Sequence, residues 1–129
     1  MDKQDYIKYW VATAETDLAA MESVFIAGRY DWSLFIGHLA LEKILKALWV
    51  KKNSSDIPTK THNLKKIADE AQYSVSEEEA LLLLEINDFN LEVRYPDYKY
   101  DFYKKCTKEF AEGYLIKIRE MFKCILKQI

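Results

Sequence analysis

Apolar side chains recur along this chain at spacings of three and four residues, and charged side chains fill the positions between them. That period matches one face of an α-helix, whereas a half-buried strand would show strict alternation of apolar and polar residues, which this chain lacks. The pattern predicts an all-α fold, an up-and-down bundle of four to five helices. The predicted helices span residues 3–26, 32–52, 63–72, 77–93 and 100–127.

The boundaries of these helices follow from capping and turn residues. Ser76 followed by Glu79 is a capping-box pattern, which opens the fourth helix. Gly28 should end the first helix, and Asp31 is the predicted N-cap of the second. The polar segment 53–58 is the clearest loop in the chain. Since only three Gly and two Pro are present, we expect the other connections to be short.

Arg94, Tyr95, Pro96 and Asp97 lie between the last two predicted helices. Proline disfavours the α conformation in the residue before it, so Pro96 should end the fourth helix. Arg94 would then lie in the last helical turn, where the helix dipole favours a cation, and Asp97 would be free to cap the next helix. This short segment therefore combines a fixed cation, a phenol and an acid, a set that can serve either structure or ligand binding.

Length and composition predict one globular domain, residues 1–129. Half of the residues are hydrophobic, which separates the chain from disordered proteins. The formal net charge of -2 gives no general attraction to nucleic acid, so any nucleotide or RNA would have to bind at a local patch. The sequence contains neither a membrane-spanning apolar stretch nor a secretory signal, so we expect a cytoplasmic protein that does not act at a membrane.

The cysteines and histidines do not form a pattern typical of a metal site. Cys106 and Cys124 fall in one predicted helix, about 27 Å apart at a rise of 1.5 Å per residue, so they cannot pair and we expect two buried thiols. The two histidines show no His-Glu-x-x-His spacing and no Cys-x-x-Cys is present. We therefore expect no metal and no resident cofactor, although a nucleotide could bind.

His38, Glu42 and Lys46 follow one another at spacings of four residues, so they project from one side of the second helix. Lys43 lies one step around that helix. Such a stripe could hold a phosphate or orient a cation on a neighbouring helix; alternatively, it is a solvated face whose Glu42 and Lys46 form a surface pair worth about 0.2 to 0.5 kcal/mol. His62 lies in the segment at the start of the third helix, where one ring nitrogen could dock on another helix while the other donates a hydrogen bond.

Several segments, taken in order, resemble HEPN domains, the small helical domains of higher eukaryotes and prokaryotes proposed to bind nucleotides. The resemblance extends from Tyr6 to Phe122. It implies a helical bundle, similar to nucleotidyltransferase substrate-binding proteins, that is frequently dimeric and often encoded beside a minimal nucleotidyltransferase in a toxin-antitoxin-like pair. The motifs that carry it most specifically are Glu42-Lys43-Ile44-Leu45-Lys46-Ala47, Thr61-His62-Asn63-Leu64 and Arg94-Tyr95-Pro96-Asp97.

The chain departs from the family's ribonuclease pattern after Arg94. Many HEPN proteins are metal-independent ribonucleases in which an arginine is followed four to six residues later by a histidine. Here residues 95–101 contain no histidine. Because the cleavage needs an imidazole that exchanges protons near neutral pH, and a guanidinium stays protonated, the sequence favours binding over cleavage.

The leading hypothesis is a non-catalytic, homodimeric domain that partners a minimal nucleotidyltransferase and binds a nucleotide or RNA. In this hypothesis Arg94 makes a bidentate contact with phosphate. Lys43 and Lys46 add positive charge, and Tyr95 or Tyr98 offers a ring on which a base can stack.

Two alternatives remain open. The chain could be a ribonuclease toxin with a degenerate site, using Arg94 with His38 or His62. It could also be a purely structural dimeric module, in which Glu42 is buried and paired with Arg94. The candidate ligand-binding residues are Arg94, Tyr95, Asp97, Glu42, Lys43, Lys46, His38 and His62.

Overall fold

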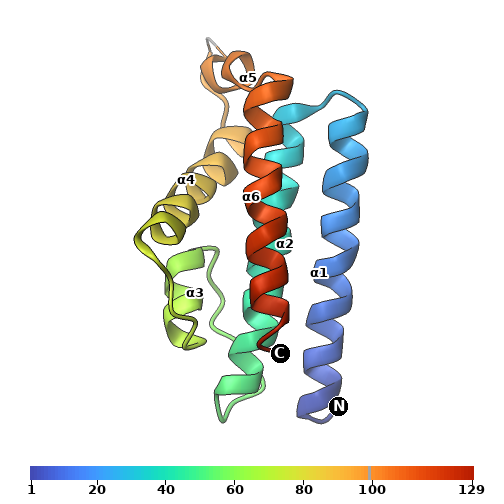
Figure 1. Cartoon of the computed structure of the whole chain (residues 1–129), viewed down its shortest axis with the longest axis vertical. Coiled ribbons are helices and arrows are strands. Elements are labelled where there is room, and N and C mark those ends of the chain that lie inside the picture. The colour runs from blue at the N-terminus through green and yellow to red at the C-terminus, as the bar shows by residue number, and fades with distance from the viewer. Residues whose placement is uncertain (99) are drawn as a thin grey trace.

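The structure, a computed structural model, describes residues 1–98 and 100–129. In those residues it contains six helices and no strand, arranged as the predicted all-α up-and-down bundle (Figure 1). None of these helices has both the length and the apolar character that a membrane span requires. The helices are α1 (Lys3–Ile26), α2 (Tyr30–Lys52), α3 (Leu64–Glu70), α4 (Glu77–Arg94), α5 (Asp101–Lys105) and α6 (Lys108–Leu126).

Helix α2 lies at the centre of the bundle and contacts α1, α3, α4 and α6. In Figure 1, α1 and α6 run alongside it, while α3 and α4 lie on the side away from α1. From Ala40 to Val50 every residue of α2 except Lys43 is buried. A helix that is largely apolar around its circumference has to be covered on all sides, which explains why α2 takes the central position.

Two glycines allow the close packing around α2. Gly28 adopts a φ of 82°, a left-handed conformation that lets the chain turn sharply between α1 and α2. Gly37 lies where α1, α2 and α6 meet, and a Cβ added there would lie 2.7 Å from Ile118 Cδ1 and 3.0 Å from Met21 Sδ. A larger side chain at position 37 would therefore force Ile118 and Met21 to shift.

Most predicted helix boundaries are confirmed. Helix α1 has the predicted bounds, and α4 opens with the expected capping box of Ser76 and Glu79. Helix α4 ends at Arg94, two residues before Pro96. The predicted N-cap of α2 is wrong, because the helix begins at Tyr30 and Asp31 lies in its first turn, where the helix dipole favours an acidic side chain.

The last predicted helix, residues 100–127, is divided into α5 and α6. Thr107 lies between them as the N-cap of α6, and its hydroxyl accepts a hydrogen bond from the Phe110 backbone N–H. Cys106 is buried as predicted, and burial raises its pKa to about 12. The burial predicted for Cys124 is wrong, since this thiol is exposed. The Asp97 carboxylate accepts the N–H of Asp101, the first residue of α5, at 2.9 Å.

Candidate functional site

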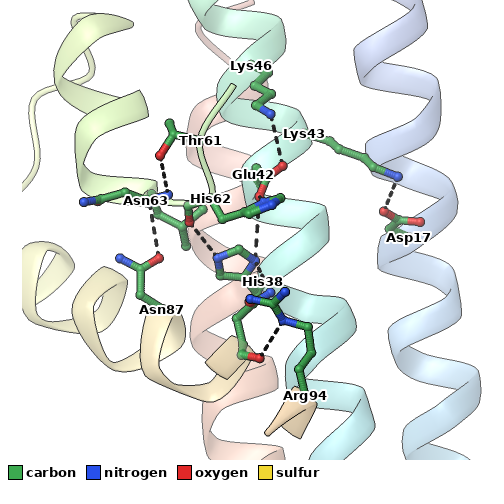
Figure 2. A network of polar contacts seen from close by, with 12 residues as sticks. Asp17, His38, Glu42, Lys43, Lys46, Thr61, His62, Asn63, Asn87 and Arg94 are labelled. Carbon is green, nitrogen blue, oxygen red and sulfur yellow. Dashed lines mark hydrogen bonds and ion pairs between the residues drawn. The ribbon is translucent and has the colours of Figure 1, made fainter. Parts of the chain in front are cut away.

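His38 is fully buried in α2, with both ring nitrogens hydrogen-bonded (Figure 2). Its Nε2 lies 2.9 Å from the backbone oxygen of His62, and since a carbonyl only accepts, Nε2 carries the hydrogen. Its Nδ1 lies 3.3 Å from Nδ2 of Asn90, whose amide donates. Burial lowers the pKa of His38, and the bond to His62 and the negative charge of Glu42 only partly oppose that effect. The imidazole is therefore neutral and fixed in one tautomer.

Glu42, one turn after His38, is 6% exposed, and each of its carboxylate oxygens has a partner. Oε1 accepts a hydrogen bond from Nδ1 of His62 at 2.8 Å, and Oε2 accepts one from Nζ of Lys46 at 3.1 Å. Lys46 is itself buried, with its ammonium 5.5 Å from the ring centroid of Trp10. The solvated-face interpretation of this stripe is therefore wrong, since an ion pair at this depth is largely shielded from water.

His62 belongs to the connection that precedes α3, and its position is set by the turn around it. The Asn63 N–H donates to the Thr61 hydroxyl, Asn63 caps α3, and the Leu64 N–H donates to the side-chain oxygen of Asn87 on α4. The His62 side chain is 65% exposed, although Glu42 holds its Nδ1. Its Nε2 has no hydrogen-bond partner within residues 1–98 and 100–129. The ring thus presents one nitrogen to solvent in a fixed orientation.

Arg94 lies at the end of α4, and its side chain runs toward His38 in Figure 2. Its Nε donates to the backbone oxygen of Asn90 at 3.3 Å, and its guanidinium carbon lies 5.3 Å from the ring centroid of Tyr95. Among the described residues Arg94 forms no ion pair, and the proposed pair with Glu42 does not exist because Glu42 engages His62 and Lys46 instead. Arg94 is exposed at the surface.

The other predicted residues lie apart from these contacts. Tyr95 is 71% exposed. Asp97 is also exposed, and its carboxylate accepts a hydrogen bond from the backbone N–H of Asp101 in α5. Lys43 turns away toward α1, where its Nζ lies 2.7 Å from Oδ2 of Asp17, as Figure 2 shows. No group of three or more His, Cys, Asp or Glu side chains in the described part of the chain is placed to hold a metal ion.

Together, His38, Glu42, Lys46, His62 and Asn90 form what we call the polar cluster. It joins α2 to α4 and to the connection before α3, with Arg94 at its margin. Asn90 is the member that sequence analysis missed. The sequence did contain a sign of its role. Asn90 lies four residues after the buried Ile86, on the apolar face of α4, where a polar side chain needs a hydrogen-bond partner.

Comparison with known proteins identifies the family. A family model described as the HEPN domain matches residues 7–129. The chain belongs to the HEPN family. No curated protein and no solved structure gave a match to it.

In this HEPN domain the motifs that predicted the family come together in space. The helix-2 motif supplies Glu42 and Lys46, the second motif supplies His62, and the third supplies Arg94. Their arrangement provides an exposed guanidinium, an oriented imidazole and a buried carboxylate that holds that imidazole. Groups of this kind can bind a phosphate, and an imidazole anchored by a carboxylate can also exchange protons.

Proposed function

We propose that this HEPN protein is a non-catalytic, homodimeric binding module of the cytoplasm, which partners a minimal nucleotidyltransferase in a toxin-antitoxin-like pair. It binds a nucleotide or RNA through phosphate. The observation that carries the proposal is the state of Arg94, which is exposed and without an ion pair among the described residues. A guanidinium whose Nε is anchored to the backbone still offers its terminal N–H groups to a phosphate.

The surroundings of Arg94 support an anionic ligand. The ring of Tyr95 and the backbone oxygen of Asn90 hold the side chain, so less conformational freedom is lost when a ligand binds. His62 adds a second exposed donor or acceptor, since its Nε2 is open to solvent while Glu42 holds the opposite side of the ring. The excess negative charge of Glu42 is offset by Lys46, so the cluster does not repel an anion.

Titration calorimetry with ATP and with a short RNA tests the proposal. Arg94→Ala should weaken binding at least tenfold, because a hydrogen bond to a charged group contributes about 1.5 to 3 kcal/mol. Arg94→Lys should restore only part of the affinity, since an ammonium lacks the bidentate fork. Lys123→Ala removes an exposed cation from α6 and should bind like the wild type. A wild-type protein that binds neither ligand would rule out this function.

One observation favours a second candidate, a metal-independent endoribonuclease. The Glu42 carboxylate fixes Nδ1 of His62 and leaves Nε2 toward solvent, which is how a general base is oriented by an acid. The histidine missing from the segment after Arg94 would then be supplied by the connection before α3. Structured RNA incubated with the protein in EDTA distinguishes the candidates: cleavage that is lost in both His62→Asn and Arg94→Ala would make the protein an enzyme.

Exposed apolar residues of α4 provide the surface through which we expect this protein to bind its partners. Leu81, Leu84 and Leu91 are 53% to 58% exposed, whereas the apolar face of α6 is covered by α1 and α2. Three large aliphatic side chains exposed on one helix mark an interaction surface. Sedimentation of the wild type and of Leu84→Glu should give a dimer and a monomer, respectively. Co-purification of a minimal nucleotidyltransferase encoded beside this protein tests the second partner.

A further inference from the structure

A cavity of about 590 Å³ lies at the end of the bundle away from the two chain termini. There the first turns of α2, the end of α4 and α5 gather, as Figure 1 shows. This volume falls within the range of about 300 to 1,000 Å³ that small-ligand pockets occupy. Its walls are mostly apolar, and none of the polar-cluster residues lines it.

Three solvent-exposed aromatic side chains line this cavity. Trp32, Tyr100 and Tyr103 line it while remaining 47%, 56% and 61% exposed, respectively. The Trp32 ring is held by an edge contact with Phe35, the two centroids lying 5.5 Å apart, which limits its motion. Exposed, oriented rings are the platforms on which nucleobases stack, because every base has a π-face.

Three charged side chains line the same cavity. They are Arg29, the N-cap residue of α2, with Asp31 and Glu92. None of the three side chains makes a hydrogen bond or ion pair to another side chain of residues 1–98 and 100–129. A carboxylate accepts from the exocyclic amino groups of adenine, cytosine and guanine, whereas uracil offers no such group. The walls therefore suit a planar base that carries an amino group better than they suit an aliphatic ligand.

Residues on both sides of Arg94 in the chain line the cavity. Val93 and Pro96 line it, and Arg94 and Tyr95 lie between them in the chain. We propose that the cavity seats one amino-bearing nucleobase, stacked on Trp32 and Tyr103, with Asp31 and Glu92 accepting from its amino group and its phosphate at Arg94. This inference rests on the proposed function, since it specifies where the base of that ligand binds.

NMR spectroscopy of the full chain tests the base site directly. The three tryptophans give three indole N–H signals, and loss of one in Trp32→Leu assigns the reporter. ATP or a ten-residue oligoadenylate should shift the Trp32 signal, while the signal of buried Trp49 stays in place. A response to ATP alone assigns a mononucleotide, and a response to oligoadenylate alone assigns RNA. UTP and oligouridylate should bind more weakly than their adenine counterparts.

Two variants measure the contribution of the rings. Trp32→Leu and Tyr103→Leu should each weaken binding of the responding ligand by about 5-fold to 150-fold. Tyr9→Leu removes a similarly exposed ring from α1, outside the cavity, and should leave the affinity unchanged. Circular dichroism of each variant confirms that the helices are retained, and Tyr103→Leu provides the test if Trp32→Leu fails to fold.

The outcomes separate this inference from the proposed function. If binding depends on Arg94 but Trp32 neither shifts nor contributes, the base site is wrong and the proposed function stands. If Trp32 shifts and contributes while Arg94→Ala binds normally, the cavity is a base site but the phosphate contact is wrong. If adenine and uracil ligands bind equally well, the assignment of Asp31 and Glu92 is overturned. If nothing binds, both proposals fail.

Discussion

Glu42 determines the electrostatics of the polar cluster, because its two oxygens hold His62 on one side and Lys46 on the other. Each partner depends on it in a different way. His62 is mostly exposed and could be solvated without Glu42, whereas the Lys46 side chain is only 10% exposed. The buried ammonium is therefore the group most affected when the carboxylate is removed, because the contact with the Trp10 ring does not replace a counter-ion.

Glu42→Ala should lower the free energy of unfolding by about 3 to 5 kcal/mol, because it leaves the charge of Lys46 buried without its counter-ion. Urea unfolding measures the change. Replacing both residues, as in Glu42→Leu with Lys46→Met, should recover most of the loss, since no buried charge remains. Glu15→Ala removes an exposed acid of α1 and should change the stability by less than about 0.5 kcal/mol. A Glu42→Ala protein as stable as Glu15→Ala would show that water reaches Lys46.

For the residues of the polar cluster, the sequence predicted which side chains share a helix face. It did not predict that these side chains are buried. The spacing of four residues placed His38, Glu42 and Lys46 together, because the helical period determines that directly. Their burial depends on the neighbouring helices, which approach α2 through contacts distant in sequence, such as the ones from Asn90 to His38 and from Trp10 to Lys46. The same limit applies to Arg94, because the sequence predicted its position in the last helical turn but left open whether it pairs with Glu42.

Among the elements, the helices with strong local signals were predicted best. The capping box of α4 and the proline after it defined both of its ends within a residue. The division between α5 and α6 was missed because apolar residues keep a helical spacing through Cys106, and only the capping hydroxyl of Thr107 marks the new start. A single threonine inside a periodic stretch is a weak signal, since its side chain also occurs within helices.

Gly37→Ala tests how closely α1, α2 and α6 pack. The new methyl group would lie 2.7 Å from Ile118 Cδ1 and 3.0 Å from Met21 Sδ, so we expect a loss of about 1 to 3 kcal/mol from overpacking. Thermal unfolding followed by circular dichroism measures it.

Gly113→Ala is the matched control within a helix. No atom lies within 4 Å of a Cβ added at Gly113 in α6, so this change should stabilise the protein by about 0.5 to 1 kcal/mol through the better helix propensity of alanine. Equal stabilisation by the two alanines would mean that the three helices adjust without cost. Adding Ile118→Val to Gly37→Ala should recover part of the loss, because it removes the closest methyl group.

In the whole molecule, α2 is shared by two groups of helices. Helices α1 and α6 pack on one part of its surface and α3 and α4 on another. His38 provides a polar link to the second group, since its two ring nitrogens bond the connection before α3 and Asn90 of α4. Opening of α3 and α4 would expose this imidazole to water, where it takes up a proton when the pH falls below its unfolded pKa.

Acid should therefore favour the opening of α3 and α4. Burial lowers the pKa of His38 in the folded protein below its unfolded value of 6.5, so the open form binds more protons as the pH falls through 6.5. Between pH 6.5 and the lower pKa of His38 in the folded protein, the closed form loses up to about 1.4 kcal/mol of stability per pH unit. Above pH 6.5 its stability does not depend on His38 in this way. Hydrogen exchange, corrected for intrinsic rates, should show α3 and α4 losing protection between pH 7.5 and pH 5.5 before α1, α2 and α6 do.

The variant His38→Gln isolates the cause of this pH dependence, because glutamine can donate to the His62 carbonyl but does not titrate. It should lower the protection of α3 and α4 at pH 7.5 and remove most of the further loss at pH 5.5. His62 and Glu42 lie beside His38 and are present in both proteins, so the difference between wild type and variant reports on His38. An equal loss of protection in the two proteins would assign the acid response to those neighbours instead.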